Sequence, residues 1–178
     1  MNKNNQIGRS MVEMLGVLAI IGVLSVGGIA GYSKAMEKFK NQKAFEQLQT
    51  ILSNLTQLQL DRKAWGEVDN VTAIRAGIIP TEMLNGKSTA TATKIYNAFN
   101  LPVDLGVCDL IFRLPDVSSC VYFATANWVG YEFIIGGYGD HLVSKTEIPL
   151  SPAKAQQICK EQIAEGEGGG YIEMSPCG

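Results

Sequence analysis

The chain has few of the residues and motifs that are typical of catalytic and nucleic-acid-binding proteins. It holds one histidine, His141, and the surrounding G-G-Y-G-D-H segment comes with no serine or cysteine nucleophile pattern. The glycine run at 168–170 is not followed by Gly-Lys-Ser or Gly-Lys-Thr, so it predicts no phosphate-binding loop. A net charge of −2 does not indicate an electrostatic nucleic-acid binder. We therefore expect no enzyme, no cofactor and no nucleic-acid site, with His141 in a surface loop.

Cysteine is scarce and widely spaced. The four residues, Cys108, Cys120, Cys159 and Cys177, form no C-x-x-C pair, which argues against a metal centre or a redox motif. Four cysteines allow three disulfide pairings, and spacing alone does not choose among them.

Charge is absent from Met14 to Ser33, a run of twenty residues. A helix of this length spans the hydrocarbon core of a membrane, roughly 30 Å thick. One carboxylate, Glu13, stands at the entrance to the run. A charge within a membrane helix costs about 2.5 kcal/mol or more, so Glu13 calls for a partner and a function.

A secretory signal peptide or a simple signal anchor would also combine a short basic start with an apolar stretch. The apolar run is longer than the usual stretch of about 7 to 15 residues, and no small-x-small cleavage site follows it. A simple anchor, moreover, gives no reason for Glu13 or for Gly8 five residues before it.

The order of residues at this point resembles the type III signal of type IV prepilins and pseudopilins. The resemblance is carried by Gly8, the polar pair Arg9-Ser10, the apolar pair Met11-Val12, Glu13 and the apolar run. It implies that a prepilin peptidase cuts between Gly8 and Arg9, so that residues 1–8 are a leader and Glu13 is the fifth mature residue. The family usually has an apolar first mature residue, and Arg9 departs from that pattern.

The resemblance gives Glu13 a partner. In an assembling filament, the new α-amino group of Arg9 is a cation that Glu13 of a neighbouring subunit can accept. Such a pair is stronger in a low dielectric than in water. A subunit inserted at the wrong height would leave both charges buried and unpaired, so Glu13 and Arg9 are predicted to set the docking position.

Four lysines follow the apolar run, and they bear on its orientation. By the positive-inside rule, Lys34, Lys38, Lys40 and Lys43 argue against an N-terminus in the cytoplasm. The resemblance argues for it, because the peptidase acts on the cytoplasmic side. We follow the resemblance and interpret the lysines as a solvated or headgroup-contacting turn.

The helix is predicted to continue beyond the lysines as an amphipathic segment. Apolar residues recur at steps of three and four at Phe45, Leu48, Leu52 and Leu55. The stripe is expected to pack on a sheet, since it covers too few heptads for a coiled coil. We predict a membrane and polymerisation helix at 9–33, its amphipathic continuation at 34–62 and a globular head at 63–178.

The head is predicted to be an antiparallel sheet with one late helix. Residues 66–104 are rich in breakers and are expected to be mostly loop, although G-I-I-P-T-E-M-L at 77–84 resembles the αβ-loop of type IVb pilins, in which an Ile-Pro turn precedes a short helix. Ser151-Pro152 begins a predicted helix that ends near Ala164. The expected strands are Val107–Leu114, Cys120–Thr125, Tyr131–Ile135 and Tyr171–Met174.

The same resemblance implies a disulfide-bounded C-terminal region. A cysteine in a strand and one in the later helix match the type IVb pattern, which pairs Cys120 with Cys159 and leaves Cys108 with Cys177. Disulfides are the normal state of an exported domain.

The fold expected is therefore α+β, a pilin fold in which a long N-terminal helix packs against an antiparallel sheet. The family implies a structural subunit, held in the bacterial inner membrane and then assembled as a homo-oligomer into an extracellular filament. Its implied partners are a prepilin peptidase and the pilus assembly machinery. The alternatives are a type II secretion pseudopilin and a membrane-anchored binding domain that does not polymerise.

Overall fold

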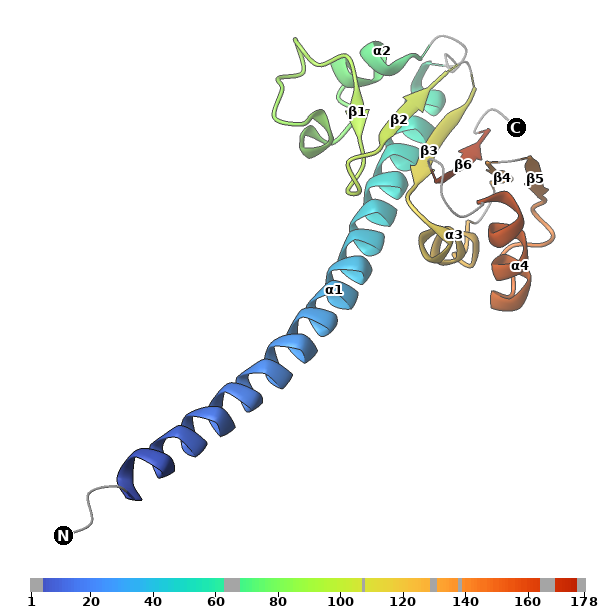
Figure 1. The fold of residues 1–178 in the computed structure, drawn as a ribbon. Helices are drawn as coiled ribbons and strands as arrows, with labels where there is room; N and C mark the ends of the chain where they lie inside the picture. The colour runs from blue at the N-terminus through green and yellow to red at the C-terminus, as the bar shows by residue number, and fades with distance from the viewer. Residues whose placement is uncertain are drawn as a thin grey trace. The chain divides into compact units, whose positions relative to one another are not determined.

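A computed structural model describes residues 5–62, 68–106, 108–128, 131–137, 139–163 and 169–175. Helix α1 runs from Asn5 to Arg62, and the chain divides into two compact units, Met1–Phe39 and Lys40–Gly178. Figure 1 labels the elements, and the second unit holds every strand and every helix after α1.

The first unit is the apolar part of α1. Its large apolar side chains from Met11 to Tyr32 are 53–75% exposed. In the part of the chain that the structure describes, one helix is long and apolar enough to cross a membrane, with a mean hydropathy of 2.2 and none of the stretch buried. The absence of charge from Met14 to Ser33 explains why this helix could cross a membrane, since apolar side chains are more stable in lipid than in water.

The second unit contains a six-stranded sheet in which every pairing is antiparallel. The spatial order is β1-β2-β3-β6-β4-β5, so the last strand in sequence lies between β3 and β4. Ladder pairs such as Phe112 with Ile172 and Ile135 with Ile172 fix this register. The strands are β1 (Ile95–Tyr96), β2 (Pro102–Leu105), β3 (Leu110–Leu114), β4 (Phe133–Gly136), β5 (Asp140–Val143) and β6 (Gly170–Met174).

Strict alternation along the strands separates a buried face from an outer face. In β3 and β6, for example, Leu110, Phe112, Leu114, Ile172 and Met174 are fully buried, whereas the residues between them are half-buried. This is the pattern of a sheet that covers a core on one side. The second half of α1 supplies the matching stripe, in which five residues enter the same core: Ala44, Leu48, Ile51, Leu52 and Leu55. The expected α+β arrangement is confirmed.

Four short helical elements complete the second unit: α2 (Asn70–Arg75), the 3-10 helix η1 (Thr81–Leu84), α3 (Val117–Ala124) and α4 (Pro152–Gln162). Helix α3 packs on α4, and α4 also contacts β4 and β5 (Figure 1). The helix predicted to begin at Ser151-Pro152 and the short helix predicted after Pro80 are both present.

The prediction of a strand at Cys120–Thr125 is wrong, because this segment lies in α3. Asp116 caps the helix by accepting a hydrogen bond from the Ser119 amide at 2.8 Å. Within the helix, the buried residues Ser119, Cys120, Phe123 and Ala124 follow a helical period. A cap and a core-facing stripe therefore outweigh the strand propensity of the β-branched and aromatic residues.

Other parts of the head are more regular than the sequence suggests. The segment 66–104, expected to be mostly loop, contains α2, η1, β1 and part of β2. His141 lies half-buried in strand β5, not in a surface loop. The other predicted strands are present with shifted ends, as β3, β4 and β6, and Val107 lies outside the described residues.

Candidate functional site

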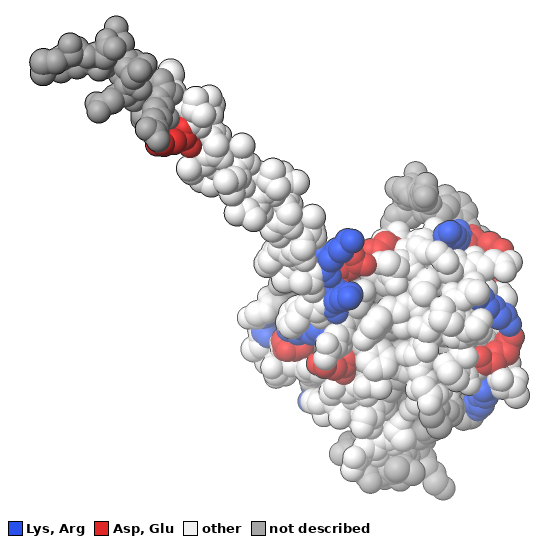
Figure 2. All heavy atoms as spheres, turned by 90° about the horizontal axis from the view of Figure 1, so that it is seen from below, with Lys and Arg blue, Asp and Glu red and all other residues white. Residues whose placement is uncertain are grey.

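The predicted processing and docking residues lie at the start of α1. Gly8 and Arg9 have helical backbone, and the side chain of Arg9 lies outside the described part of the structure. Glu13 is exposed on the same helix, four residues after Arg9. In Figure 2 a white, uncharged stretch of helix follows the acidic atoms beside the grey N-terminal residues. The structure thus places one carboxylate at the edge of an exposed apolar surface.

Five glycines lie along the apolar part of α1: Gly16, Gly22, Gly27, Gly28 and Gly31. A Cβ added at any of them would meet nothing within 4 Å. Small residues on an open helix surface allow a second helix to approach closely in lipid. This half of α1 is therefore suited to packing against other helices.

The second half of α1 is held to the head by a polar cluster on one side. Gln47 is 5% exposed; its amide donates to Glu82 at 2.8 Å and accepts from the Ala98 backbone at 2.8 Å. Lys43 pairs with the same Glu82 carboxylate at 3.4 Å. The Asn54 amide donates to the Ile78 carbonyl at 2.8 Å. These contacts fasten η1 and its neighbouring loops to α1.

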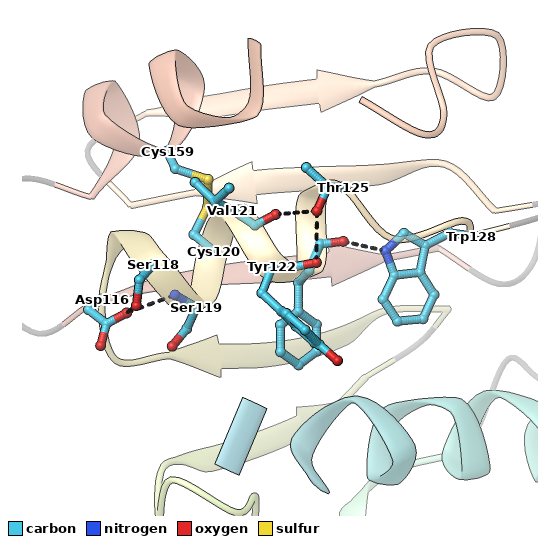
Figure 3. Close-up of a disulfide and its surroundings, with 10 residues drawn as sticks. Asp116, Ser118, Ser119, Cys120, Val121, Tyr122, Thr125, Trp128 and Cys159 are labelled. Carbon is cyan, nitrogen blue, oxygen red and sulfur yellow. Dashed lines mark hydrogen bonds between the residues drawn. A yellow bond between two sulfur atoms is a disulfide. The ribbon is translucent and has the colours of Figure 1, made fainter. Parts of the chain in front are cut away.

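An aromatic cluster holds the opposite side of α1. Phe45 packs on Trp128 with ring centroids 4.8 Å apart and on Phe123 at 5.9 Å. The Trp128 indole N–H donates to the Phe123 carbonyl at 2.8 Å, as Figure 3 shows. Farther along α1, Thr56 and Tyr131 share a hydrogen bond of 2.8 Å. The helix is thus clamped between two parts of the chain that are distant in sequence.

A disulfide joins α3 to α4. Cys120 and Cys159 are bonded, with 5.9 Å between their Cα atoms and neither side chain exposed (Figure 3). This is the pair that the resemblance implies, although Cys120 lies on a helix instead of a strand. Cys108 is also disulfide-bonded, and its predicted partner Cys177 lies outside the described residues.

The start of α3 carries a structural carboxylate that the sequence analysis missed. Burial by itself would raise the pKa of Asp116, but hydrogen bonds from the Ser119 amide and the Ser118 hydroxyl outweigh it and lower the pKa. The P-D-V-S-S order at 115–119 is the signal that was available, since an aspartate three residues before an amide donor is an N-cap pattern.

The outer face of the sheet carries a second group of carboxylates. The Tyr171 hydroxyl donates to Asp140 at 2.8 Å, and this bond, with burial and nearby negative charge, raises the pKa of Tyr171 to about 12. The Tyr171 ring lies where a Cβ on Gly136 would stand, so a larger residue there would displace the ring. Burial and the charges of Asp109 and Asp140 raise the pKa of Glu173.

Among the described residues, no group of His, Cys, Asp and Glu side chains could hold a metal ion.

Comparison with known proteins gives a consistent result. The chain is 27% identical over 168 residues to the major structural subunit of bundle-forming pilus from Escherichia coli O111:H-, covering 90% of this chain and 83% of that protein. The protein of the same description from Escherichia coli O127:H6 matches to the same extent. The chain is thus similar, over most of its length, to pilus subunits that are type IVb pilins. No protein-family model and no solved structure matches the chain.

The match extends well beyond the N-terminal motif. At 90% of the chain it takes in most of the head, whereas the sequence resemblance is carried mainly by the residues from Gly8 to the end of the apolar run. The long apolar helix and the antiparallel sheet of this chain agree with that similarity.

Proposed function

We propose that the chain is a structural subunit of a type IV pilus that polymerises through the first half of α1. The observation that carries the proposal is an exposed, uncharged helix joined to a domain with its own core. The relatives are named as major structural subunits of a pilus, which supports the same role. The role is structural, with the surface filament as the product and no catalytic step.

Before assembly, the subunit is held in the inner membrane with Arg9 on the cytoplasmic side. A prepilin peptidase removes residues 1–8 after Gly8, and the assembly machinery then draws the subunit from the bilayer into an extracellular filament. The support for this sequence of events is the motif from Gly8 to Glu13 followed by twenty uncharged residues.

N-terminal sequencing of the exported protein tests the processing step. We expect the chain to begin at Arg9. A start at Met1 would contradict cleavage, and a start after Ser10 would place Glu13 at the third mature position and remove the basis for the docking role.

Glu13 sets the height at which a subunit docks, by accepting the α-amino group of Arg9 from a neighbouring subunit. The pair lies among apolar side chains, where an uncompensated charge costs several kcal/mol. Replacement of Glu13 by Ala removes one partner and leaves the other buried.

The Glu13→Ala variant should therefore insert in the membrane as the unaltered chain does and yield few filaments. Membrane fractionation and immunogold electron microscopy measure the two properties separately. Glu37→Ala is the matched control, since Glu37 lies on the same helix beyond the uncharged run, and it should leave filament yield unchanged. A normal yield from Glu13→Ala would contradict the docking role.

Labelled surface fibres distinguish the proposed function from the other two expectations. A secretion pseudopilin and a membrane-anchored binding domain would both leave the cell surface without fibres that carry this protein. Absence of such fibres from the unaltered chain, in a host with its assembly machinery, would contradict the proposal.

A further inference from the structure

A hollow lies beside the second half of α1, on the side that its own head leaves open. It has a volume of about 300 Å³ and is lined by Gln49, Leu52, Ser53, Asn127, Trp128 and Tyr131. A second hollow of about 300 Å³ shares Gln49 and Ser53 with the first and continues along the helix to Glu46. We call the two hollows together, from Tyr131 to Glu46, the α1 groove.

The α1 groove is polar and mostly uncharged. Within the described residues, the side chains of Gln49, Ser53 and Asn127 make no hydrogen bond, so their donors and acceptors remain available. Glu46 is the one charged residue among the described residues that line it. An occupant that fits this chemistry is small, carries hydroxyl or amide groups, and bears a positive charge at one end.

The chain itself exposes such a segment. Residues Ser88 to Thr91 are all exposed, and they form a turn in which the Thr91 amide donates to the Ser88 carbonyl at 3.0 Å. The side chains are small and three of the four bear hydroxyls. Exposed lysines, Lys87 and Lys94, stand on either side. We call Ser88–Thr91 the hydroxyl turn.

The α1 groove and the hydroxyl turn are different surfaces of the same unit, and the groove runs across the exposed face of α1 from Tyr131 to Asn54. Gln47, which binds η1, and Thr56, which binds Tyr131, are nine residues apart on α1, about two and a half turns, and so lie on opposite sides of the helix. Figure 1 likewise places the segment between η1 and β1 on one side of α1 and α3 on the other. A contact between such unlike surfaces is heterologous, and its repetition builds an open filament when the rotation between subunits does not close a ring.

We propose that the hydroxyl turn of one subunit occupies the α1 groove of the next subunit in the filament, with Lys87 or Lys94 against Glu46. The hydroxyls of the turn supply partners for Gln49, Ser53 and Asn127, and its small side chains let its backbone approach the surface of α1. This inference rests on the proposed function, because it needs copies of the chain side by side.

Cysteine crosslinking in assembled filaments tests the contact. The Ser53→Cys/Thr89→Cys variant of the full chain, sheared from cells and mildly oxidised, should give disulfide-linked dimers and higher species on a non-reducing gel. Each single variant should give no ladder. Lys145→Cys/Thr89→Cys is the matched control, since Lys145 is exposed and does not line the groove, and it should remain monomeric.

Filaments of the double variant without the ladder would overturn this inference and leave the proposed function standing. Absence of filaments from the unaltered chain would contradict both. If the cysteines prevent assembly, charge-reversal variants test the contact instead. Glu46→Lys should lower pilus yield about fivefold, because it places like charges opposite each other. Adding Lys87→Glu and Lys94→Glu to that variant should restore the yield. A normal yield from Glu46→Lys, or no recovery in the combined variant, would overturn the inference.

Discussion

At the scale of single residues, the pair Tyr171 and Asp140 is the clearest electrostatic feature of the head. The hydrogen bond between them, together with burial, keeps the Tyr171 hydroxyl protonated to unusually high pH. The side chains meet because Gly136 leaves room for the Tyr171 ring on the neighbouring strand. A residue without a side chain on β4 thus permits a polar contact between β6 and β5.

Because of this contact, the free energy of unfolding should depend on pH in the alkaline range. The pKa of Tyr171 rises from 10.0 to about 12, so the bond contributes its full stability below pH 10 and loses it as pH rises toward 12. Replacing Asp140 by Asn should move the ionisation of Tyr171 back toward 10.0. Ultraviolet absorbance of tyrosinate as a function of pH measures this pKa. The Tyr171→Phe variant gives the titration of the other tyrosines, which is subtracted. An unchanged titration in Asp140→Asn would contradict the assignment.

The ionised Glu173 side chain should lower the free energy of unfolding at neutral pH. It is half-buried between Ile111 and Ile134 on the adjacent strands, and burial with two nearby carboxylates raises its pKa. A raised pKa means that the protonated form is favoured in the fold, so its stabilising contribution is present below the ordinary value of 4.5 and is lost as pH rises through the higher folded value.

Glu173→Gln should therefore stabilise the chain at pH 7 by up to about 1 kcal/mol, with no gain below about pH 4. Denaturant unfolding of the full chain in detergent at both pH values measures the difference. Glu132→Gln, an exposed carboxylate, is the control and should change little. A loss of stability at neutral pH would show that the Glu173 charge has a favourable partner.

At the scale of elements, the bond between α3 and α4 is the main cross-link of the C-terminal region. Cys120 and Cys159 are separated by 39 residues in the sequence, and a closed loop of that size corresponds to about 4 kcal/mol in the chain-entropy model. Measured values for removed native disulfides are about 2–5 kcal/mol.

Replacing both cysteines by Ala should lower the free energy of unfolding by about 2–4 kcal/mol and loosen α4 first, because α4 packs mainly on α3, to which the disulfide ties it, and less on β4 and β5. Denaturant unfolding gives the total, and hydrogen exchange locates the loosened amides. Equal unfolding midpoints for the unaltered and doubly substituted chains would contradict a stabilising role for this bond.

The helices α3 and α4 differ in how well their secondary structure can be predicted from the sequence. Helix α4 begins with Ser151 and Pro152, a cap and a first-turn proline, and both are local signals. The prediction of a strand at Cys120–Thr125 is wrong because a short run with valine, tyrosine and phenylalanine satisfies either period. The N-cap pattern at Asp116 is the local signal that favours the helix, and in the structure Asp116 accepts the hydrogen bond from the Ser119 amide.

At the scale of the whole molecule, the two units differ in what stabilises them. All the described residues of the apolar core lie between Ala44 and Met174, within the second unit. From Met11 onward, where the structure describes its side chains, the first unit buries none of its large apolar residues. The head therefore has the contacts it needs to fold, whereas the apolar helix requires lipid or other helices.

A chain beginning at Lys40 should accordingly be soluble without detergent, monomeric, and cooperative in thermal unfolding. Size-exclusion chromatography and circular dichroism measure these properties, with the full chain in detergent for comparison. Aggregation or a broad, non-cooperative transition would mean that residues before Lys40 are needed for the fold of the head.

The sequence by itself determined the long apolar helix, the position of Glu13 at its edge and the alternation of the strands, because these depend on local spacing and on the absence of charge. Only the tertiary structure decided that β6 lies between β3 and β4, that Cys120 meets Cys159 from a helix, and that Gln47 and Thr56 hold α1 from opposite sides. Each of these joins residues distant in sequence, and burial and hydrogen bonding choose such partners only when the whole core is assembled.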